Sequence, residues 1–164
     1  MSKKNKWDTK GMPKKGYYIP TYPKKVLMAE NQQNNGMIVY RSSWERLFMY
    51  WCDHNQSVTK WSSEPFAIPY IKPTDFKTHR YYIDFYFECV DSNGGTKKYI
   101  VEVKPLAETM YPKPPKRVTE KTTLSYQNRI DTYNINQAKW EAAIKFAKLN
   151  NLEFIIITEE DLGI

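Results

Sequence analysis

Residues 81–104 of the 164-residue chain read YYIDFYFECVDSNGGTKKYIVEVK. Aromatic and β-branched side chains, which favour extended backbone, fill both ends of this run. Between them, Asp-Ser-Asn-Gly-Gly at residues 91–95 is typical of a hairpin turn. The run therefore predicts a long strand over 80–90, a tight turn, and a returning antiparallel strand over 97–104.

The returning strand contains Glu102-Val103-Lys104, the only Glu-x-Lys in the chain. Side chains two residues apart on a strand share a face, so Glu102 and Lys104 project together. Symmetric pairing about the turn brings Asp84 opposite about residue 103, within a residue or two. Two carboxylates offer hard oxygen ligands to Mg²⁺, and a lysine beside them can orient a water molecule or stabilise a transition state. This set suits phosphodiester hydrolysis, and an exposed cross-strand ion pair is the alternative.

A helix is predicted just upstream, over residues 43–54. Ser42 has the position of an N-cap and Glu45 follows three residues later, which is the capping-box pattern. The helix has one apolar face, because large side chains recur at helical spacing: Trp44, Leu47, Phe48 and Trp51. Two roles stay open for Glu45: it caps the helix, or its carboxylate reaches the sheet edge where a metal ion would bind.

The remaining elements predict a central mixed sheet flanked by helices, an α/β fold of the mixed (α+β) type. Short strands are expected over residues 37–40, 58–61 and 66–71, with a turn at 73–75. The C-terminal half is expected to contain a basic, proline-rich loop over 105–118, a helical stretch from about residue 122, a helix capped by Asn134 or Asn136 that ends near Asn150, and a fully buried strand over 153–158.

The charge of the chain favours a polyanionic partner. The net charge is +7, and the 13 Tyr and 5 Trp side chains can pack in a core and also stack on bases. Eight of the lysines lie within residues 1–25, among prolines and tyrosines. We expect residues 1–36 to form a basic extended N-terminal arm that lies along phosphates, and residues 37–164 to form the folded domain. A disordered solubilising tail is the alternative for the arm.

Several other classes of protein are disfavoured. Two cysteines do not make a disulfide framework and are typical of a reducing compartment. There is no run of about 18 apolar residues, and no apolar stretch of a signal peptide follows the lysine-rich N-terminus. A zinc site is a weak alternative, because its four available side chains lack the spacing of paired zinc ligands: Cys52, His54, His79 and Cys89. We expect a soluble, intracellular or particle-bound protein with no membrane partner.

The order of these motifs resembles the PD-(D/E)XK nuclease superfamily. An apolar strand ends in Asp84, a hairpin follows, the next strand carries Glu102 and Lys104, and an upstream helix supplies Glu45. Ile83 stands where the superfamily often has proline, a position that donates no ligand.

This resemblance implies a restriction-endonuclease-like core and a Mg²⁺-dependent endonuclease acting on double-stranded DNA, with Mn²⁺ able to substitute for Mg²⁺. The catalytic residues that it implies are Glu45, Asp84, Glu102 and Lys104. The metal ligands that it implies are Asp84, Glu102, the backbone carbonyl of Val103 and, as an open case, Glu45.

A narrower resemblance runs from about residue 40 to the C-terminus. The segments at 41–46, 102–105, 136–140 and 156–159 resemble the head-completion nucleases of T-even-type tailed bacteriophages. It implies action on packaged DNA ends before tails attach, in the host cytoplasm or the virion, with portal or head-neck proteins as partners. It also implies that Gln137 or Lys139 contacts the site or the DNA; exposed residues in the first turns of a helix are the alternative.

Six basic side chains are further candidates for phosphate contacts: Arg46, Arg80, Lys113, Lys116, Arg117 and Arg129. No reading helix or separate recognition domain is visible, so recognition of DNA shape is favoured over a base code. Two competing functions stay open. One is a non-cutting, DNA-binding head-closure protein, and the other is a plain nucleic-acid-binding module.

Overall fold

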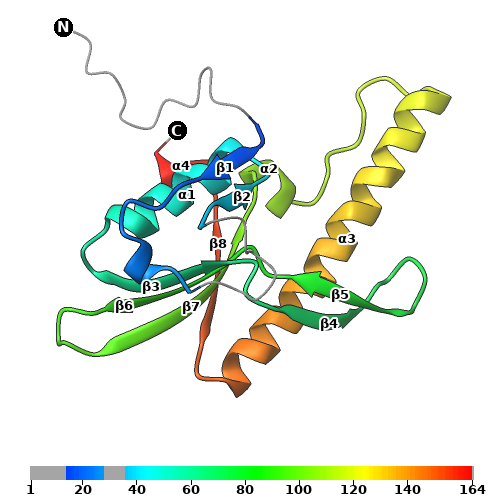
Figure 1. Cartoon of the computed structure of the whole chain (residues 1–164). Coiled ribbons are helices and arrows are strands. Elements are labelled where there is room, and N and C mark those ends of the chain that lie inside the picture. Colours follow the sequence, from blue (N-terminus) through cyan, green and yellow to red (C-terminus); the bar gives the residue numbers. More distant parts are fainter. Residues whose placement is uncertain (1–13, 28–35, 164) are drawn as a thin grey trace, which may run out of the picture.

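The computed structural model describes residues 14–27 and 36–163 (Figure 1). A four-stranded sheet of order β3-β6-β7-β8 lies at the centre. Its strands are β3 (Val58–Ser63), β6 (Phe85–Val90), β7 (Thr96–Val103) and β8 (Glu153–Ile157). The pairs β3·β6 and β6·β7 are antiparallel and β7·β8 is parallel. The sheet is therefore mixed, as the sequence predicted.

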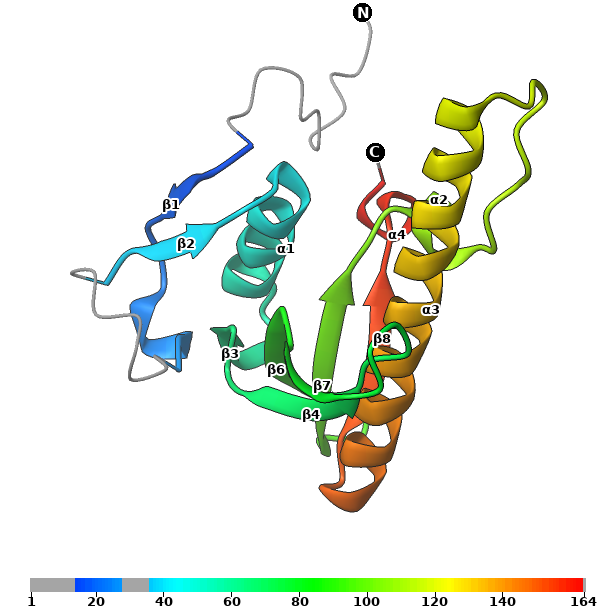
Figure 2. The same cartoon turned by 90° about the vertical axis from the view of Figure 1, so that its right-hand side faces the viewer.

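Helices cover both faces of this sheet, with α1 on one face and α3 on the other (Figure 2). The helices are α1 (Ser43–His54), α2 (Leu106–Thr109), α3 (Glu120–Leu149), α4 (Glu159–Leu162) and the 3₁₀ helix η1 (Pro23–Lys25). Two small antiparallel sheets pair β1 (Gly16–Tyr18) with β2 (Ile38–Tyr40) and β4 (Ala67–Ile71) with β5 (Thr78–Tyr82). Within the described residues, none of the helices is long and apolar enough to cross a membrane.

Strand alternation divides the core into two halves. On β7, Val101 packs in the cluster beneath α1, whereas Ile100 packs in the cluster beneath α3. The same alternation sends Ile155 and Ile156 of β8 to opposite faces. By this rule Glu102, two residues after Ile100, belongs to the face covered by α3.

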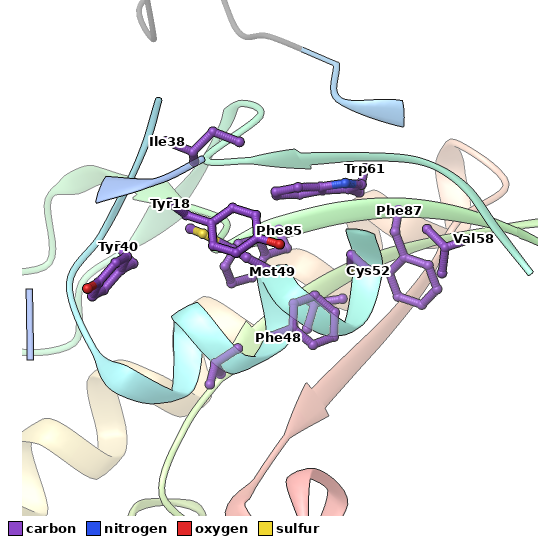
Figure 3. Packing of buried hydrophobic residues seen from close by; sticks show 12 residues of the cluster. Tyr18, Ile38, Tyr40, Phe48, Met49, Cys52, Val58, Trp61, Phe85 and Phe87 are labelled. Carbon is purple, nitrogen blue, oxygen red and sulfur yellow. The ribbon is translucent and has the colours of Figure 1, made fainter. Parts of the chain in front are cut away.

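The half beneath α1 is rich in aromatic side chains (Figure 3). Phe48 of α1 lies 4.9 Å, between ring centroids, from Phe85 of β6 and 6.0 Å from Phe87. Trp61 is fully buried in the same cluster and packs edge-on against Tyr18. Burial of such side chains stabilises each by about 1.5–3 kcal/mol relative to exposure. The apolar face predicted for residues 43–54 is therefore the face that packs on the sheet.

The prediction of one strand over residues 80–90 is wrong. The run breaks at Ile83 and Asp84 into β5 and β6, which lie in different sheets. Ile83 donates its N–H to the Phe66 carbonyl at 3.3 Å and is fully buried beneath α3, so the chain turns inward there. The first part pairs with β4 and the second enters the central sheet between β3 and β7. As a result, Asp84 lies in the short link between β5 and β6 and not within a strand.

Three predictions in the C-terminal half need correction. Neither Asn134 nor Asn136 caps a helix, because α3 runs unbroken from a capping box at Thr119 and Thr122, and packing overrides the weak helix propensity of asparagine. The basic loop is shorter than predicted, because α2 occupies its beginning. Strand β8 is half-buried and not fully buried, because it lies at the edge of the sheet.

The hairpin turn at residues 91–95 is confirmed. Asp91 donates its N–H to the Gly95 carbonyl at 2.8 Å, and its side-chain Oδ1 accepts the N–H groups of Asn93 and Gly95, each at 2.9 Å. Gly94 has φ of +79°, a conformation that favours glycine. The turn is therefore closed by local chemistry alone.

Part of the predicted basic arm lies against the domain. Strand β1 pairs with β2, and Lys14 and Lys15 before it are exposed. Residues 1–13 and 28–35 of that arm, with the lysines they contain, lie outside the described residues. The division into an arm over 1–36 and a domain over 37–164 stays a prediction.

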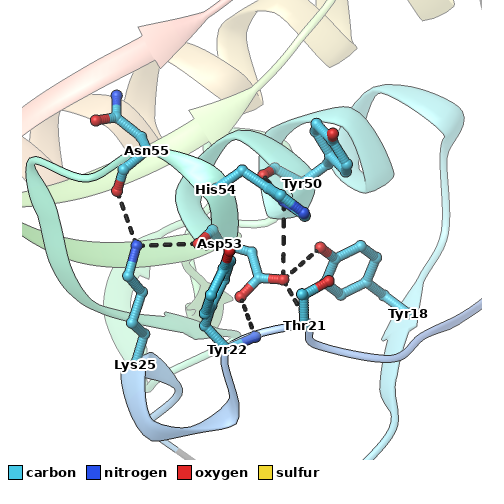
Figure 4. Close-up of polar contacts among 8 residues, drawn as sticks. All are labelled: Tyr18, Thr21, Tyr22, Lys25, Tyr50, Asp53, His54 and Asn55. Carbon is cyan, nitrogen blue, oxygen red and sulfur yellow. Dashed lines mark hydrogen bonds and ion pairs between the residues drawn. The ribbon is translucent and has the colours of Figure 1, made fainter.

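Asp53 holds this segment against the end of α1 (Figure 4). Its carboxylate is fully buried and accepts three hydrogen bonds: from Tyr18 Oη at 2.8 Å, from Thr21 N at 2.7 Å and from Tyr22 N at 3.1 Å. Lys25 Nζ donates to the Asp53 carbonyl at 2.9 Å. A buried carboxylate requires such partners, because an unpaired one is costly.

We expect Asp53→Ala to lower the free energy of unfolding by about 2–3 kcal/mol, because it removes a charged acceptor and leaves the buried Tyr18 hydroxyl without its partner. Urea denaturation followed by tryptophan fluorescence measures this, since Trp61 packs against Tyr18. Asp53→Asn is the matched control and should lose less, because its amide oxygen still accepts. Wild-type stability of Asp53→Ala would contradict the role of this carboxylate.

Candidate active site

The candidate site lies at the end of the central sheet where β7 finishes. Phe85 pairs with Val101, so continuation of the register by one residue places Asp84 opposite Glu102. Asp84 Oδ2 accepts the N–H of Val103 at 2.8 Å, which fixes its carboxylate against β7. The two carboxylates predicted to meet across this hairpin therefore do so, one residue from the register of symmetric pairing.

Glu102 is buried with both carboxylate oxygens engaged. Only 3% of its surface is exposed. Oε2 accepts a hydrogen bond from the Tyr81 hydroxyl at 2.6 Å, and Oε1 lies 3.3 Å from Lys104 Nζ. An exposed cross-strand ion pair does not describe this arrangement, because the carboxylate is withdrawn from solvent. Tyr81 and Lys104 together hold the carboxylate in one orientation.

The electrostatics of the site are strongly perturbed. Burial is the largest cause that raises the pKa of Asp84 well above its usual value, and the charge of Glu102 raises it further. Burial acts to lower the pKa of Lys104, but the carboxylates of Glu102 and Asp84 outweigh it and leave that pKa raised. Lys104 is therefore an ammonium at neutral pH, and a negative charge on Glu102 disfavours a second one on Asp84. Such perturbation is common where groups are arranged for function.

Glu45 lies in the first turn of α1, where it contributes to the cap, and its charge also acts on Asp84. Ser42 Oγ accepts the Glu45 N–H at 3.0 Å, and Glu45 Oε2 accepts the Arg41 N–H at 2.8 Å. In the predicted capping box the Glu45 side chain would accept the N–H of the N-cap residue Ser42. Here it accepts the N–H of Arg41, one residue earlier. Burial raises the pKa of Glu45, and the charge of Glu45 adds to the rise in the pKa of Asp84. The capping role is therefore observed, whereas Glu45 forms no group with Asp84 and Glu102 that could hold a metal ion among the described residues, and its role as a ligand stays a prediction.

Lys139 reaches the same site from the middle of α3. Its Nζ lies 5.5 Å from the ring centroid of Tyr81 and 5.9 Å from that of Tyr70. Burial lowers the pKa of Lys139, the charge of Glu102 opposes this, and the Lys104 ammonium lowers it further. Lys139 is thus a second lysine beside Glu102. Its neighbour Gln137 is half-buried, and both residues are mid-helix and not in the first turns predicted for them.

Tyr81 and Tyr70 were not among the predicted site residues. Both lie on the β4–β5 hairpin, which packs against α3. Tyr81 is only three residues before Asp84, but a continuous strand would have turned the two side chains to opposite faces. The break at Ile83 is what brings them together, and nothing in the local sequence signals that break.

The other predicted phosphate contacts are scattered over the surface. Lys113 and Arg129 come together, since Arg129 Nη2 donates to the Lys113 carbonyl at 3.1 Å, and both line a cavity of about 520 Å³ with Tyr111 and Tyr133. The others are placed as follows: Lys116 and Arg117 exposed in the loop before α3, Arg80 exposed on β5, and Arg46 half-buried on α1.

The structure does not gather the four side chains weighed for zinc. Cys52 is fully buried in the core beneath α1, and His79 is on β5, where its Nε2 lies 2.8 Å from Asp75 Oδ2. In residues 14–27 and 36–163, no group of three or more His, Cys, Asp or Glu side chains is close enough to hold a metal ion. Any metal at Asp84 and Glu102 would therefore take its remaining ligands from other groups.

Comparison with known proteins gives two concordant results. Residues 55–159, about two thirds of the chain, match the model of the TnsA-like endonuclease N-terminal domain family. The chain is also similar to the head completion nuclease of Enterobacteria phage T4, with 36% identity over 125 residues, which cover 76% of this chain and 81% of the phage protein. The family match includes Asp84, Glu102, Lys104 and Lys139.

Proposed function

Because this chain belongs to the TnsA-like endonuclease N-terminal domain family, we propose that it is a Mg²⁺-dependent endodeoxyribonuclease that hydrolyses phosphodiester bonds in double-stranded DNA. The observation that carries the proposal is the meeting of Asp84, Glu102 and Lys104 at one end of the sheet, with two repelling carboxylates beside a charged lysine. The net charge of +7 supports a polyanionic substrate.

The donor set fits a divalent cation. Carboxylate oxygens are the ligands that Mg²⁺ prefers, and Mg²⁺ commonly binds through one or two carboxylates while it keeps several waters. Each oxygen of Glu102 has a second acceptor site besides the one used by Tyr81 or Lys104. The ligands that we assign are Asp84, Glu102 and the Val103 carbonyl, with Glu45 as a further contributor, and Mn²⁺ is expected to substitute. A bound Mg²⁺ would lower the pKa of a water and neutralise phosphate charge.

The side chains of the chain divide the remaining work. Lys104, held 3.3 Å from Glu102, orients the attacking water and stabilises charge on the phosphate as the new P–O bond forms and the bond to the leaving sugar oxygen breaks. Tyr81 holds Glu102 in place. Lys139 adds a second positive charge for the phosphate from α3. The assigned catalytic residues are Glu45, Asp84, Glu102 and Lys104.

We also propose a biological role for this chain, based on its similarity to the head completion nuclease of phage T4. In this proposal the protein acts in head completion on packaged DNA ends, before tails join, in the host cytoplasm or the virion. Portal or head-neck proteins would be its partners there. Six exposed or half-buried basic residues and Gln137 are assigned to contact DNA with Lys139: Arg46, Arg80, Lys113, Lys116, Arg117 and Arg129.

A second candidate is a DNA-binding head-closure protein that does not cut. Two observations favour it: both oxygens of Glu102 are already partnered, and no third acidic, histidine or cysteine ligand joins Asp84 and Glu102 among the described residues. A Glu102→Ala phage that still produces viable, tail-joined heads would select this candidate over the nuclease.

The nuclease is tested by incubating purified protein with supercoiled plasmid in EDTA, in Mg²⁺ and in Mn²⁺. We expect nicked or linear plasmid in both metals and none in EDTA, because the two carboxylates need a cation between them and the phosphate. Agarose gels resolve the products, and a gel shift in Ca²⁺ measures binding separately. Retarded but uncut DNA in both metals would contradict the nuclease and favour the non-cutting protein.

A further inference from the structure

The tip of the β4–β5 hairpin is a tightly closed loop. Lys72 donates its N–H to the Lys77 carbonyl at 2.9 Å, and Phe76 donates its N–H to the Lys72 carbonyl at 2.8 Å. Asp75 Oδ1 accepts the Lys77 N–H at 3.0 Å, while its Oδ2 contacts His79. These bonds hold the backbone of the loop in one shape, and one large apolar side chain of this loop is exposed to solvent.

That side chain is Phe76, which packs in neither core cluster of the described residues. It is 81% exposed, and its backbone has φ of +56°. This left-handed conformation is unfavourable for a bulky L-residue and would suit glycine or asparagine. A benzyl ring in water adds nothing to the core, and strained backbone at a solvent-exposed tip calls for a functional reason.

The surroundings of Phe76 are basic. Lys72, Lys77 and Arg80 lie on the same hairpin, and its one carboxylate, Asp75, is already held by the Lys77 N–H and His79. This positive charge is complementary to the phosphate backbone of DNA and disfavours a basic or apolar partner.

The root of the hairpin is fastened to the candidate site. Tyr81 of β5 donates its hydroxyl to Glu102, and Tyr70 of β4 lies against Lys139. The hairpin leaves the site and projects past α3 (Figure 1, Figure 2). Phe76 is five positions from Tyr81 along the chain, which spans at most roughly 17 Å, or about five base-pair steps of duplex.

We propose that the β4–β5 hairpin is a DNA-deforming wing whose Phe76 ring inserts between base pairs within about five steps of the bond that is cut. Apolar wedges inserted in this way unstack a step and bend the duplex, which is easiest at nicks, ends and flexible steps. The preferred substrate is therefore DNA that opens readily, such as an end or a nicked duplex. This inference rests on the proposed function, since it requires DNA as the ligand.

The test compares Phe76→Asn and Phe76→Trp with the wild type on duplexes that carry 2-aminopurine at successive positions around a nick. Asparagine tolerates positive φ, so Phe76→Asn should fold with an unchanged or higher Tm. We expect wild type and Phe76→Trp to raise 2-aminopurine fluorescence at one step, and Phe76→Asn to lose this signal and to bind about tenfold more weakly. Leu149→Asn, at the end of α3 and 86% exposed, is the control and should behave as wild type.

The outcomes separate the two levels of inference. If Phe76→Asn binds, cuts and unstacks DNA as the wild type does, the proposed role of the wing is wrong, and the proposed nuclease function is unaffected. If the wild type itself neither binds nor cuts DNA while it remains folded, the proposed function is wrong and the wing falls with it. Loss of binding in Phe76→Asn together with an equal loss in Leu149→Asn would also overturn the wing, because the effect would not belong to the hairpin tip.

Discussion

Lys104→Met is expected to lower the rate of plasmid nicking by about a hundred- to a thousandfold, with DNA affinity kept within about threefold of wild type. Lys104 is half-buried, its Nζ lies 3.3 Å from Glu102, and its pKa is raised, so it is charged when the phosphate is attacked. Methionine has a similar length and apolar stem but no charge. The change therefore removes transition-state stabilisation without opening a cavity.

Nicking rates under single-turnover conditions and gel-shift affinities in Ca²⁺ measure the two effects separately. Lys98→Met is the matched control, because Lys98 is an exposed lysine on the same strand, toward the hairpin turn. It should alter salt-dependent binding slightly and leave the nicking rate unchanged. Wild-type nicking by Lys104→Met would remove Lys104 from the catalytic set, and the assignment of the site would fail with it.

Asp84→Asn is expected to abolish nicking and, in EDTA at neutral pH, to raise Tm by about 2–4 °C. The sign follows from the pKa, which burial and then the Glu102 charge raise above the value of an unfolded chain. The folded protein binds the proton more tightly, so this group favours folding fully only below the unfolded pKa and loses that contribution as pH rises through the folded pKa. At neutral pH the raised pKa of Asp84 is therefore a cost to folding, and asparagine, which does not titrate, removes that cost.

Thermal unfolding at several pH values, with EDTA or Mg²⁺, tests this second expectation. The stability difference between Asp84→Asn and wild type should shrink as the solution is acidified, and Mg²⁺ should stabilise the wild type more than the variant. Asparagine can still accept the Val103 N–H, so the local geometry is kept. Glu141→Gln, an exposed carboxylate on α3, is the control for loss of one negative charge. A lower Tm for Asp84→Asn in EDTA at neutral pH would contradict repulsion between Asp84 and Glu102.

These experiments address different properties of the same site. Loss of nicking in both variants with binding kept would separate chemistry from substrate capture. If Mg²⁺ stabilises the wild type but the wild type does not cut DNA, the site binds a cation without catalysis. That result would favour the non-cutting head-closure protein.

Local patterns were enough to predict several elements correctly. The helix over residues 43–54 begins and ends where the cap and apolar spacing placed it. The hairpin at 91–95 closes through the Asp91 side chain and a glycine with positive φ, all within five residues. Glu102 and Lys104 share a face because the strand period is two. Each of these rests on interactions between near neighbours in the chain.

Features that depend on distant partners were missed or misplaced. The run at 80–90 carries the same aromatic pattern on both sides of Ile83, so only its pairing with β4 on one side and with β3 and β7 on the other reveals the break. The two asparagines suggested as caps lie inside α3, where tertiary packing of the helix outweighs a weak local preference.

The sequence by itself therefore determined the residue pattern of the candidate site: two carboxylates, a Glu-x-Lys strand and a hairpin to join them. Tertiary structure decided their surroundings. Tyr81 meets Glu102 because the chain changes sheets at Ile83, and Lys139 arrives from a helix that packs across the face of the sheet. Side-chain periodicity is encoded over a few residues, whereas the burial that raises the pKa of Asp84 exists only once remote elements close over it.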